Sequence, residues 1–190
     1  MDADGLTFAC ATTAEERVAK RLGLRTVRVG VRAANGVPEA RLVSFGLAGA
    51  LDEAYRVGDV IDATRVVDES GAVLWEGEPL GASPARTGTI LGASRIVDDP
   101  AERARLHAAT GADAVDMESG ALARSGRLVG CLRAISDTPT HRLGGVAQGA
   151  TPDGGVDVVG FLRGFVREPA VTVRAARGAR RALRSLERVA

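Results

Sequence analysis

The chain has 190 residues, 45% of them hydrophobic, and a formal net charge of +1 at pH 7. This length predicts one domain with a substantial core, and the near-neutral charge argues against a dedicated nucleic-acid-binding protein. Aromatic residues make up 3% of the chain, which argues against base-stacking platforms and aromatic cages. No apolar run approaches the roughly 20 residues of a membrane span, and the acidic start MDADG does not fit a signal peptide. We therefore expect a soluble, cytoplasmic protein.

The N-terminal part begins with an apolar run, LTFACA at residues 6–11, which predicts a first, central strand. Thr12 or Thr13 can cap the helix that follows. Glu15 and Glu16 fall in the first turn of that helix, where the helix dipole stabilises carboxylates. The dipole alone can therefore account for both glutamates.

A second unit consists of two strands joined by a turn. Residues 26–31 alternate like a strand, and residues 35–38, with Asn-Gly followed by a proline, predict a turn. Residues 42–49, LVSFGLAG, then predict a strand that runs into a glycine-bearing turn. Gly46 and Gly49 would let the backbone approach a ligand closely in that turn.

The middle of the chain alternates strands and helices. Residues 69–71 predict a hairpin turn, and residues 89–96, TILGASRI, predict a strand that bends at Gly92. Asp99 can cap the amphipathic helix expected at residues 101–110. The hydrophobic content of 45% together with 24 glycines fits a compact α/β protein that is rich in turns.

In residues 111–140, acidic side chains stand at the ends of two apolar, strand-like runs. A short strand, a short helix and a buried strand at residues 128–135 are expected here, with Glu118 after the first strand and Asp137 after the second. Ligands of open α/β sheets bind outside the carboxyl ends of strands, so both carboxylates are expected to face one crevice. Such a pair is typical of acid–base chemistry on a small polar molecule. Both could instead simply cap the helix and the turn that follow them.

The C-terminal part is expected to hold a glycine-rich loop over the site at residues 143–155 and a helix at residues 156–165. Residues 171–189 then predict a basic amphipathic helix, whose arginines form either a solvated face or a surface that meets anionic lipid headgroups. We expect residues 1–168 to form one α/β domain and residues 169–190 to pack on it or extend from it.

The metal-binding and redox signals are weak. Cys10 and Cys131 lie in apolar, strand-like runs, which predicts buried, reduced thiols. His107 and His141 stand far from the cysteines and from each other, without metal-ligand spacing. We expect no metal and no cofactor.

Four ordered motifs carry a resemblance to a known family: SFGLAGALDEAYRVGDV from Ser44, then VDMES, LRAISD, and a tail of the form DG…FLRGFVREP. Together they resemble the nucleoside phosphorylase and methylthioadenosine/adenosylhomocysteine nucleosidase superfamily, and are most similar to its hopanoid-associated phosphorylase family. The resemblance implies a single-domain α/β fold in three layers, with a central twisted mixed β-sheet flanked by helices. Residues 32–41 are shorter than the matching segment of typical members.

The resemblance also implies catalytic roles. Asp137 would protonate N7 of adenine, and Glu15, with Glu16 as the fallback, would take the proton from the attacking water. Arg133 would position that water or neutralise the acids. Glu118 would stay ionised, bind the ribose hydroxyls and stabilise the sugar as it becomes cationic.

Further residues of the implied site surround the sugar and the base. Met117 would pack under the ribose, and Asp116 would assist with a sugar hydroxyl. The adenine would contact Asp137 together with Arg95, Ile96 and Ser136. Arg95 stands where nucleosidases place an aromatic ring, and it either stacks on the purine or points to solvent.

The nucleophile is expected to bind at a loop formed by Ser44, Gly46, Ala48 and Gly49. Phosphorylases of this superfamily place an arginine and a hydroxyl residue at the positions that here hold Ser44 and Leu47. A leucine cannot donate to an oxyanion, and a serine offers one neutral donor in place of a guanidinium. Water is therefore favoured over phosphate, although nucleosidases often use a hydroxyl at the position of Leu47 to orient that water.

The sequence thus predicts an N-ribosyl hydrolase that releases adenine from a 5′-substituted adenosine, with adenosylhopane as the leading substrate. The alternatives are a methylthioadenosine/adenosylhomocysteine nucleosidase, a phosphorylase that uses phosphate, and a non-catalytic nucleoside-binding relative. The expected ligand is a small-molecule nucleoside, which is lipid-linked if the substrate is adenosylhopane. Peripheral contact with a membrane surface is a further expectation. Because relatives are dimers or trimers of dimers, we expect a homodimer or a higher homo-oligomer.

Overall fold

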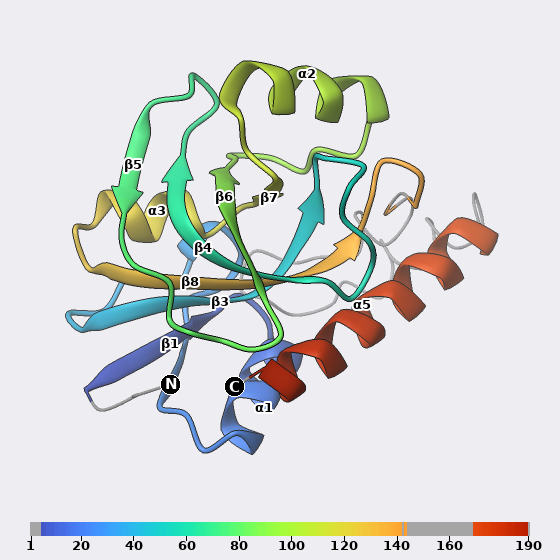
Figure 1. Cartoon of the computed structure of the whole chain (residues 1–190). Helices are drawn as coiled ribbons and strands as arrows, with labels where there is room; N and C mark the ends of the chain where they lie inside the picture. The colour runs from blue at the N-terminus through green and yellow to red at the C-terminus, as the bar shows by residue number, and fades with distance from the viewer. Residues whose placement is uncertain (1–4, 142, 144–168, 190) are drawn as a thin grey trace.

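A computed structural model describes residues 5–141, 143 and 169–189. Figure 1 shows the strands and helices of this part of the chain. In chain order they are β1 (Leu6–Cys10), α1 (Thr13–Arg21), β2 (Thr26–Arg28), the 3₁₀ turn η1 (Val31–Ala33), β3 (Arg41–Ala50), β4 (Val60–Val67), β5 (Val73–Glu76), β6 (Arg86–Gly92), α2 (Pro100–Thr110), β7 (Ala114–Asp116), α3 (Ser119–Arg124), β8 (Leu128–Asp137) and α5 (Pro169–Val189).

Within the described residues, the strands form one mixed sheet in the order β2-β1-β3-β7-β6-β4-β5, and β8 pairs with both β3 and β4. Because β3 pairs with β7, β7 with β6 and β6 with β4, the two pairings of β8 close these strands into a ring. The expected central mixed sheet is confirmed. β1 is not central, however, since it lies between the edge strand β2 and β3.

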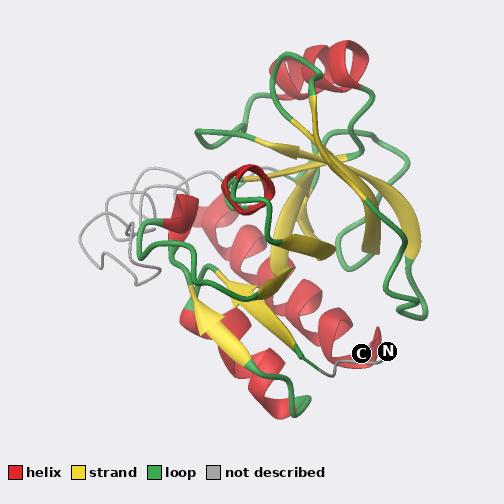
Figure 2. Cartoon of the chain, turned by 90° about the vertical axis from the view of Figure 1, so that its left-hand side faces the viewer, coloured by secondary structure: helices red, strands yellow, loops and turns green. Residues whose placement is uncertain are grey.

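Helices cover the sheet from both sides, as the three-layer expectation requires. Alternate side chains of a strand point to opposite faces. On β3, Phe45 packs in one apolar cluster with Val18 of α1 and Leu186 of α5, whereas Leu42 packs in another with Leu122 of α3. Figure 2 shows α2 at the opposite end of the molecule from α1.

Two glycines set the position of α3 against the sheet. A Cβ atom added at Gly92 would lie 2.5 Å from both N and Cα of Gly120, so the two backbones can meet only without side chains. β6 ends at Gly92, and the strand predicted for residues 89–96 is therefore wrong at its C-terminal end. The chain leaves the sheet here and forms the rim of the cavity described below.

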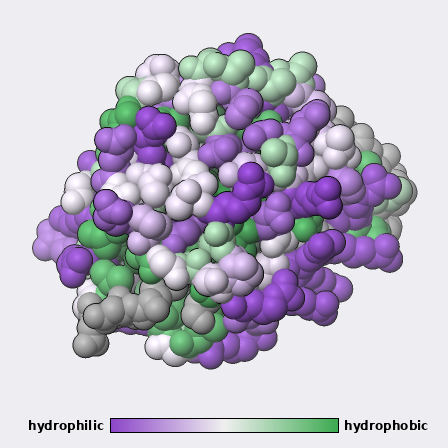
Figure 3. Space-filling view, viewed as in Figure 1, coloured by the Kyte–Doolittle hydropathy of each residue, from purple (hydrophilic) through white to green (hydrophobic). Residues whose placement is uncertain are grey.

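The long basic helix predicted at residues 171–189 is confirmed as α5. Its apolar stripe, including Ala182 and Leu186, is buried against α1 and the sheet. Its arginines lie on the outer side, which Figure 3 shows as a hydrophilic surface at the lower right. A Cβ atom at Gly178 would overlap the carbonyl oxygen of Ser136, so α5 lies directly against the end of β8.

Three further expectations concern the cysteines, membrane-spanning helices and the segment that precedes α5. Both cysteines are free and buried, and burial raises the pKa of Cys131 to about 11. In the part of the chain that the structure describes, no helix is both long and apolar enough to span a bilayer. The helix predicted at residues 156–165 and all but Leu143 of the predicted glycine-rich loop fall outside the described residues.

Candidate active site

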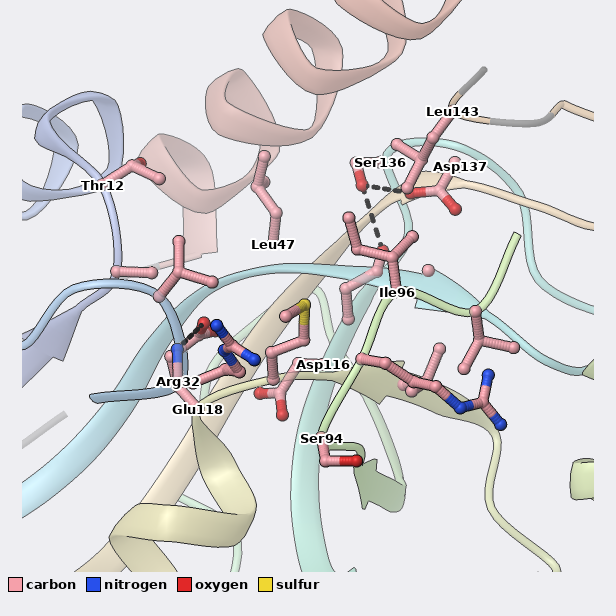
Figure 4. Close-up of a pocket in the computed structure, with 18 of the residues that line it drawn as sticks. Thr12, Arg32, Leu47, Ser94, Ile96, Asp116, Glu118, Ser136, Asp137 and Leu143 are labelled. Atoms are coloured by element: carbon pink, nitrogen blue, oxygen red, sulfur yellow. Dashed lines mark hydrogen bonds between the residues drawn. The ribbon is translucent and has the colours of Figure 1, made fainter. Parts of the chain in front are cut away.

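A cavity of about 510 Å³ opens where the ends of several elements meet (Figure 4). Its walls come from the β1–α1 junction, η1, the end of β3, the segment after β6, the β7–α3 junction and the end of β8. Most of the predicted site residues line it: Glu15, Ala48, Gly49, Arg95, Ile96, Asp116, Met117, Glu118, Ser136 and Asp137. Glu118 and Asp137, which the sequence placed at the ends of two strands, therefore do face one cavity.

β3 runs from Arg41 to Ala50 and pairs with β8, so Gly46 and Gly49, which the sequence assigned to a glycine-bearing turn, lie within a strand. Ser44 and Gly46 lie in the strand, behind the cavity rather than on its wall. The Ser44 hydroxyl accepts a hydrogen bond from Nη2 of Arg133 at 2.5 Å and lies 2.9 Å from the Ser119 hydroxyl. The predicted nucleophile loop is therefore part of the sheet, and only Ala48 and Gly49 of it reach the cavity.

Glu15 both caps α1 and lines the cavity. Its Oε2 accepts hydrogen bonds from the backbone N–H and the hydroxyl of Thr12, at 2.7 and 2.9 Å, which completes a capping box at the start of α1. Its Oε1 accepts from the backbone N–H of Leu47 at 2.8 Å, and the side chain lines the cavity. Glu16 instead pairs with Lys20 at 2.6 Å. Glu15 is therefore the glutamate that the fold brings to the site.

The absence of a side chain at residue 46 makes this arrangement possible. A Cβ atom there would overlap Oε1 of Glu15 and would lie 2.8 Å from Nη1 of Arg133. The space beside Gly46 is therefore occupied by the Glu15 carboxylate and the Arg133 guanidinium. The sequence had predicted that the backbone would contact a ligand there.

Arg133 is fully buried beneath the cavity floor. Its Nη2 lies 2.6 Å from Oδ2 of Asp116 and 3.6 Å from Oε2 of Glu118. These carboxylates raise the pKa of Arg133 above its ordinary value, against the opposing effect of burial. Ser119, which the sequence did not single out, donates to Asp116 through its hydroxyl and, at 3.0 Å, through its backbone N–H. Arg133 therefore forms ion pairs with both acids, an arrangement in keeping with the charge-neutralising role that the resemblance implied.

Glu118 occupies the position before α3 but does not cap that helix with its side chain. Its Oε1 accepts a hydrogen bond from the backbone N–H of Arg32 at 3.2 Å. Burial raises the pKa of Glu118 to about 8, helped by Asp116 and Glu15 and opposed by Arg133. This shift favours the neutral acid, whereas the sequence predicted a carboxylate that stays ionised.

Asp137 ends β8, and its side chain is held from two directions. Oδ1 accepts a hydrogen bond from the Ser136 hydroxyl at 2.6 Å, and Oδ2 accepts one from Nη2 of Arg103. Arg103 lies on α2 and was not predicted. The available signal was its spacing, since Arg103 stands three residues before the buried Leu106 and therefore on the inward face of the helix.

The predicted base-binding residues form the rim of the cavity. Arg95 lies 2.6 Å from Glu102 and 3.6 Å from Glu69, which holds its guanidinium between two carboxylates. Ile96 lines the cavity and is 37% exposed. The geometry accordingly favours the solvent-facing alternative for Arg95 over a planar stack on a purine.

Carboxylates from α1, the β7–α3 junction and β8 thus surround one mostly apolar space, each fixed by identifiable donors. Such a space suits a neutral organic molecule that needs a proton donor at one end and charge stabilisation at the other. Among the described residues, no three histidine, cysteine or acidic side chains gather in a way that could hold a metal ion.

One protein-family model matches a segment of the chain that contains part of this site. Residues 76–153 match the model of the family described as the phosphorylase superfamily. This segment includes the β7–α3 junction and β8, and therefore Glu118, Arg133 and Asp137. No curated protein matches the chain in sequence.

Solved structures of similar fold share little sequence identity with the chain. A mutant MTAN of Helicobacter pylori with 5′-methylthioadenosine in the active site is 15% identical, with a TM-score of 0.57 over 95% of this chain and 96% of that one. Futalosine hydrolase of Helicobacter pylori strain 26695 is 13% identical, with a TM-score of 0.56 over the same shares. A 5′-methylthioadenosine/S-adenosylhomocysteine nucleosidase of S. pneumoniae with the transition-state inhibitor MT-ImmA is 16% identical, with a TM-score of 0.57 over 96% and 98%. The chain thus has the mixed α/β fold of these nucleosidases over nearly its whole length, with residues 76–153 matching the phosphorylase superfamily.

Proposed function

We propose that the protein is a purine nucleosidase of the phosphorylase superfamily, which hydrolyses the N-ribosyl bond of a 5′-substituted adenosine and releases adenine. The observation that carries the proposal is the set of Glu15, Glu118 and Asp137 on the wall of one cavity, delivered by three separate elements. A module that only binds a nucleoside does not need this acid–base set, which argues against a non-catalytic role.

The proposed reaction replaces the bond between C1′ and N9 with a bond between C1′ and a water oxygen. Asp137 donates a proton to N7, because a purine leaves more readily when it departs neutral. As the bond breaks, the ribose becomes cationic, and the ionised form of Glu118 stabilises it. Glu15 accepts the proton of the attacking water, so one proton passes to the purine and one passes from the water to the enzyme.

The contacts of β3 support water as the nucleophile. Ser44, at a position that phosphorylases use for phosphate, is buried and bound to Arg133 and Ser119. Leu47 stands at the second position that phosphorylases use for phosphate, and it lines the cavity with an apolar side chain. Arg133 is already paired with Asp116 and Glu118, so its charge is not available to a phosphate.

Phosphorolysis is the second candidate, and one observation favours it. Arg32 lines the cavity beside Glu118, and an arginine is well suited to bind a phosphate ion. Adding phosphate distinguishes the two reactions, because hydrolysis yields the free 5-substituted ribose and phosphorolysis yields its 1-phosphate.

The 5′ substituent is the least constrained part of the proposal. Two of the solved relatives of similar fold carry names or ligands with a 5′-methylthioadenosine group, which supports an adenine base with a 5′ substituent. Adenosylhopane remains our proposed natural substrate on the resemblance of the motifs. The exposed arginines of α5 are compatible with a lipid-linked substrate presented at an anionic surface, and a homo-oligomer remains a prediction.

The test is release of adenine from a panel of 5′-substituted adenosines, measured by chromatography with and without added phosphate. We expect adenine and the free 5-substituted ribose in phosphate-free buffer, at a rate that phosphate does not raise. Release only in the presence of phosphate would assign the second candidate, and no release from any member of the panel would refute nucleoside cleavage.

A further inference from the structure

Arg103 is a buried charge that the proposed mechanism does not use. It lies on the inward face of α2 and is 1% exposed. A buried guanidinium is strongly disfavoured unless a carboxylate and hydrogen-bond acceptors surround it. Arg103 nevertheless lies beside Asp137, the proton donor of the proposed reaction.

The contacts of Arg103 fix its orientation from several sides. Nε donates to the carbonyl oxygen of Val97 at 3.0 Å, and Nη1 donates to that of Ala50 at 3.1 Å. Nη2 donates to Oδ2 of Asp137 and lies 3.9 Å from Oδ1 of Asp98. The guanidinium is thus anchored by backbone groups that flank the cavity, and its remaining edge is directed at Asp137.

The Arg103–Asp137 ion pair packs directly against Gly49 of β3. A Cβ atom at Gly49 would lie 2.6 Å from Oδ2 of Asp137 and 3.1 Å from Nη2 of Arg103. Residue 49 must therefore lack a side chain for the ion pair to form. This fit ties the geometry of Asp137 to α2 and β3 as well as to its own strand.

We propose that Arg103 is a positioning residue for Asp137. It holds Oδ2, which leaves Oδ1, beside the Ser136 hydroxyl, as the oxygen that exchanges a proton with the substrate. When Asp137 gives its proton to the purine, the guanidinium stabilises the carboxylate that forms. The inference deepens the proposed nucleosidase function and rests on it.

This role makes a specific prediction about leaving groups. Arg103 can assist only the step in which the leaving group takes up a proton. A purine needs that proton, whereas p-nitrophenolate departs as a stable anion. Loss of Arg103 should therefore slow the cleavage of a nucleoside much more than the cleavage of p-nitrophenyl β-D-ribofuranoside. A residue that served only the folded structure would affect both substrates alike.

The experiment compares Arg103→Met, Arg103→Lys and the wild type on 5′-methylthioadenosine and on the nitrophenyl riboside. For Arg103→Met we expect kcat on the nucleoside to fall by about 100-fold, the usual size of a single acid–base or charge-stabilising contribution. We expect KM to change little, kcat on the nitrophenyl riboside to change by less than about threefold, and Arg103→Lys to recover part of the loss. Arg105→Met, at an exposed position of the same helix, is the matched control and should behave like the wild type.

A second variant covers the case in which Arg103→Met does not fold. Gly49→Ala inserts a methyl group between Asp137 and Arg103 without removing either charge, and it should give the same selective loss on the nucleoside. If the nitrophenyl riboside is not a substrate of the wild type, Arg103→Met is tested in an Asp137→Asn background, where it should lower adenine release no further.

The outcomes test the role of Arg103 separately from the nucleosidase function. Equal losses on both substrates, or a further loss in the Asp137→Asn background, would overturn the role of Arg103 while leaving the nucleosidase function intact. If the wild type cleaves no nucleoside at all, the function falls and the inference falls with it.

Discussion

The acids of the cavity differ in the hydrogen-bond donors and cations that surround them. Glu15 accepts backbone and hydroxyl hydrogen bonds on both oxygens, Asp116 is paired with Arg133, and Asp137 is paired with Arg103. Glu118 has one backbone donor and a more distant guanidinium. Burial therefore raises the pKa of Glu118 by more than Arg133 and the Arg32 N–H lower it.

The raised pKa of Glu118 predicts a pH dependence of catalysis. If the ionised form stabilises the sugar cation, kcat/KM should rise with pH and level off above about pH 8. Glu118→Gln should lower kcat/KM and remove this rise. A pH–rate profile from about pH 5 to 9 measures both effects, and an unchanged profile in the variant would show that Glu118 is not the group responsible.

The same pKa predicts a pH dependence of stability with a definite sign. The folded protein retains the Glu118 proton up to about pH 8, whereas the unfolded chain releases it near the ordinary value of 4.5. Between these values the folded state binds more protons, so the contribution of this group to the unfolding free energy falls as pH rises. The Tm of Glu118→Gln should therefore rise relative to the wild type between about pH 5 and 8. A difference in Tm that stays constant or shrinks over this range would contradict the assignment.

Asp137 carries the proton in the proposed reaction, so Asp137→Asn should lower kcat for adenine release by roughly 10²–10⁴-fold. Substrate binding should be largely kept, since an amide can still hydrogen-bond to the base. Stopped-flow or equilibrium binding alongside turnover separates the two quantities. Turnover close to that of the wild type would mean that another group protonates the purine.

How much of the site the sequence predicts depends on the distance between partners. Glu118 and Asp137 were predicted because each directly follows a short apolar strand, a local pattern. Two partners of these acids, Arg103 and Arg32, were not predicted, because Arg103 reaches Asp137 across 34 residues and Arg32 reaches Glu118 across 86. Such pairings depend on how α2 and η1 pack, which composition and periodicity do not encode.

At the scale of elements, glycines determine how closely the strands and helices approach the acids. Gly46, Gly49 and Gly178 each leave space that a neighbouring carboxylate, guanidinium or carbonyl oxygen occupies. The sequence indicated these positions as sites of ligand approach or left them unremarked. In the structure they accommodate the protein's own polar groups.

Gly46→Ala tests this packing within β3. The added methyl group would overlap Oε1 of Glu15, so Glu15 must move from the cavity wall, and turnover should fall by at least about tenfold. Gly130→Ala in β8 is the control, because there the added atom meets the flexible side chain of Leu80. Steady-state kinetics on both variants is the measurement, and equal activity of the two would show that Glu15 is not displaced or not needed.

Gly178→Ala tests the contact between α5 and β8. Alanine favours a helix over glycine by about 1 kcal/mol, yet its Cβ would overlap the carbonyl oxygen of Ser136. We expect a lower Tm and a lower kcat, because the strain falls next to Asp137. Ala179→Gly, on the same helix, should lower Tm through propensity alone and leave kcat unchanged. A higher Tm and normal kcat in Gly178→Ala would show that α5 adjusts freely.

The predictions for whole elements succeeded where a pattern was long or continuous. The basic helix α5 and the buried strand β8 were predicted from periodicity and from an apolar run. The predicted ends of β3 and β6 were wrong because glycines read as turn or bend signals. In β3 the glycines lie inside the strand and in β6 the glycine ends it, and the difference lies in what packs against each one.

At the scale of the molecule, the ring of strands explains why distant segments share one cavity. β8 pairs with both β3 and β4 and closes the ring, which brings the ends of β3, β7 and β8 and the start of α1 to a common wall. The class of fold was predictable from the order of the motifs. The closure was not, since it depends on which strands pair, and pairing is a long-range property.

A crystal structure with formycin A, an adenosine analogue whose carbon–carbon ribosyl bond cannot be hydrolysed, tests the central claim most directly. The account predicts that the base nitrogen equivalent to N7 lies within about 3 Å of Asp137, and that the ribose hydroxyls lie within about 3 Å of Glu118. A nucleoside bound outside this cavity, or bound in it with neither carboxylate in contact, would contradict it.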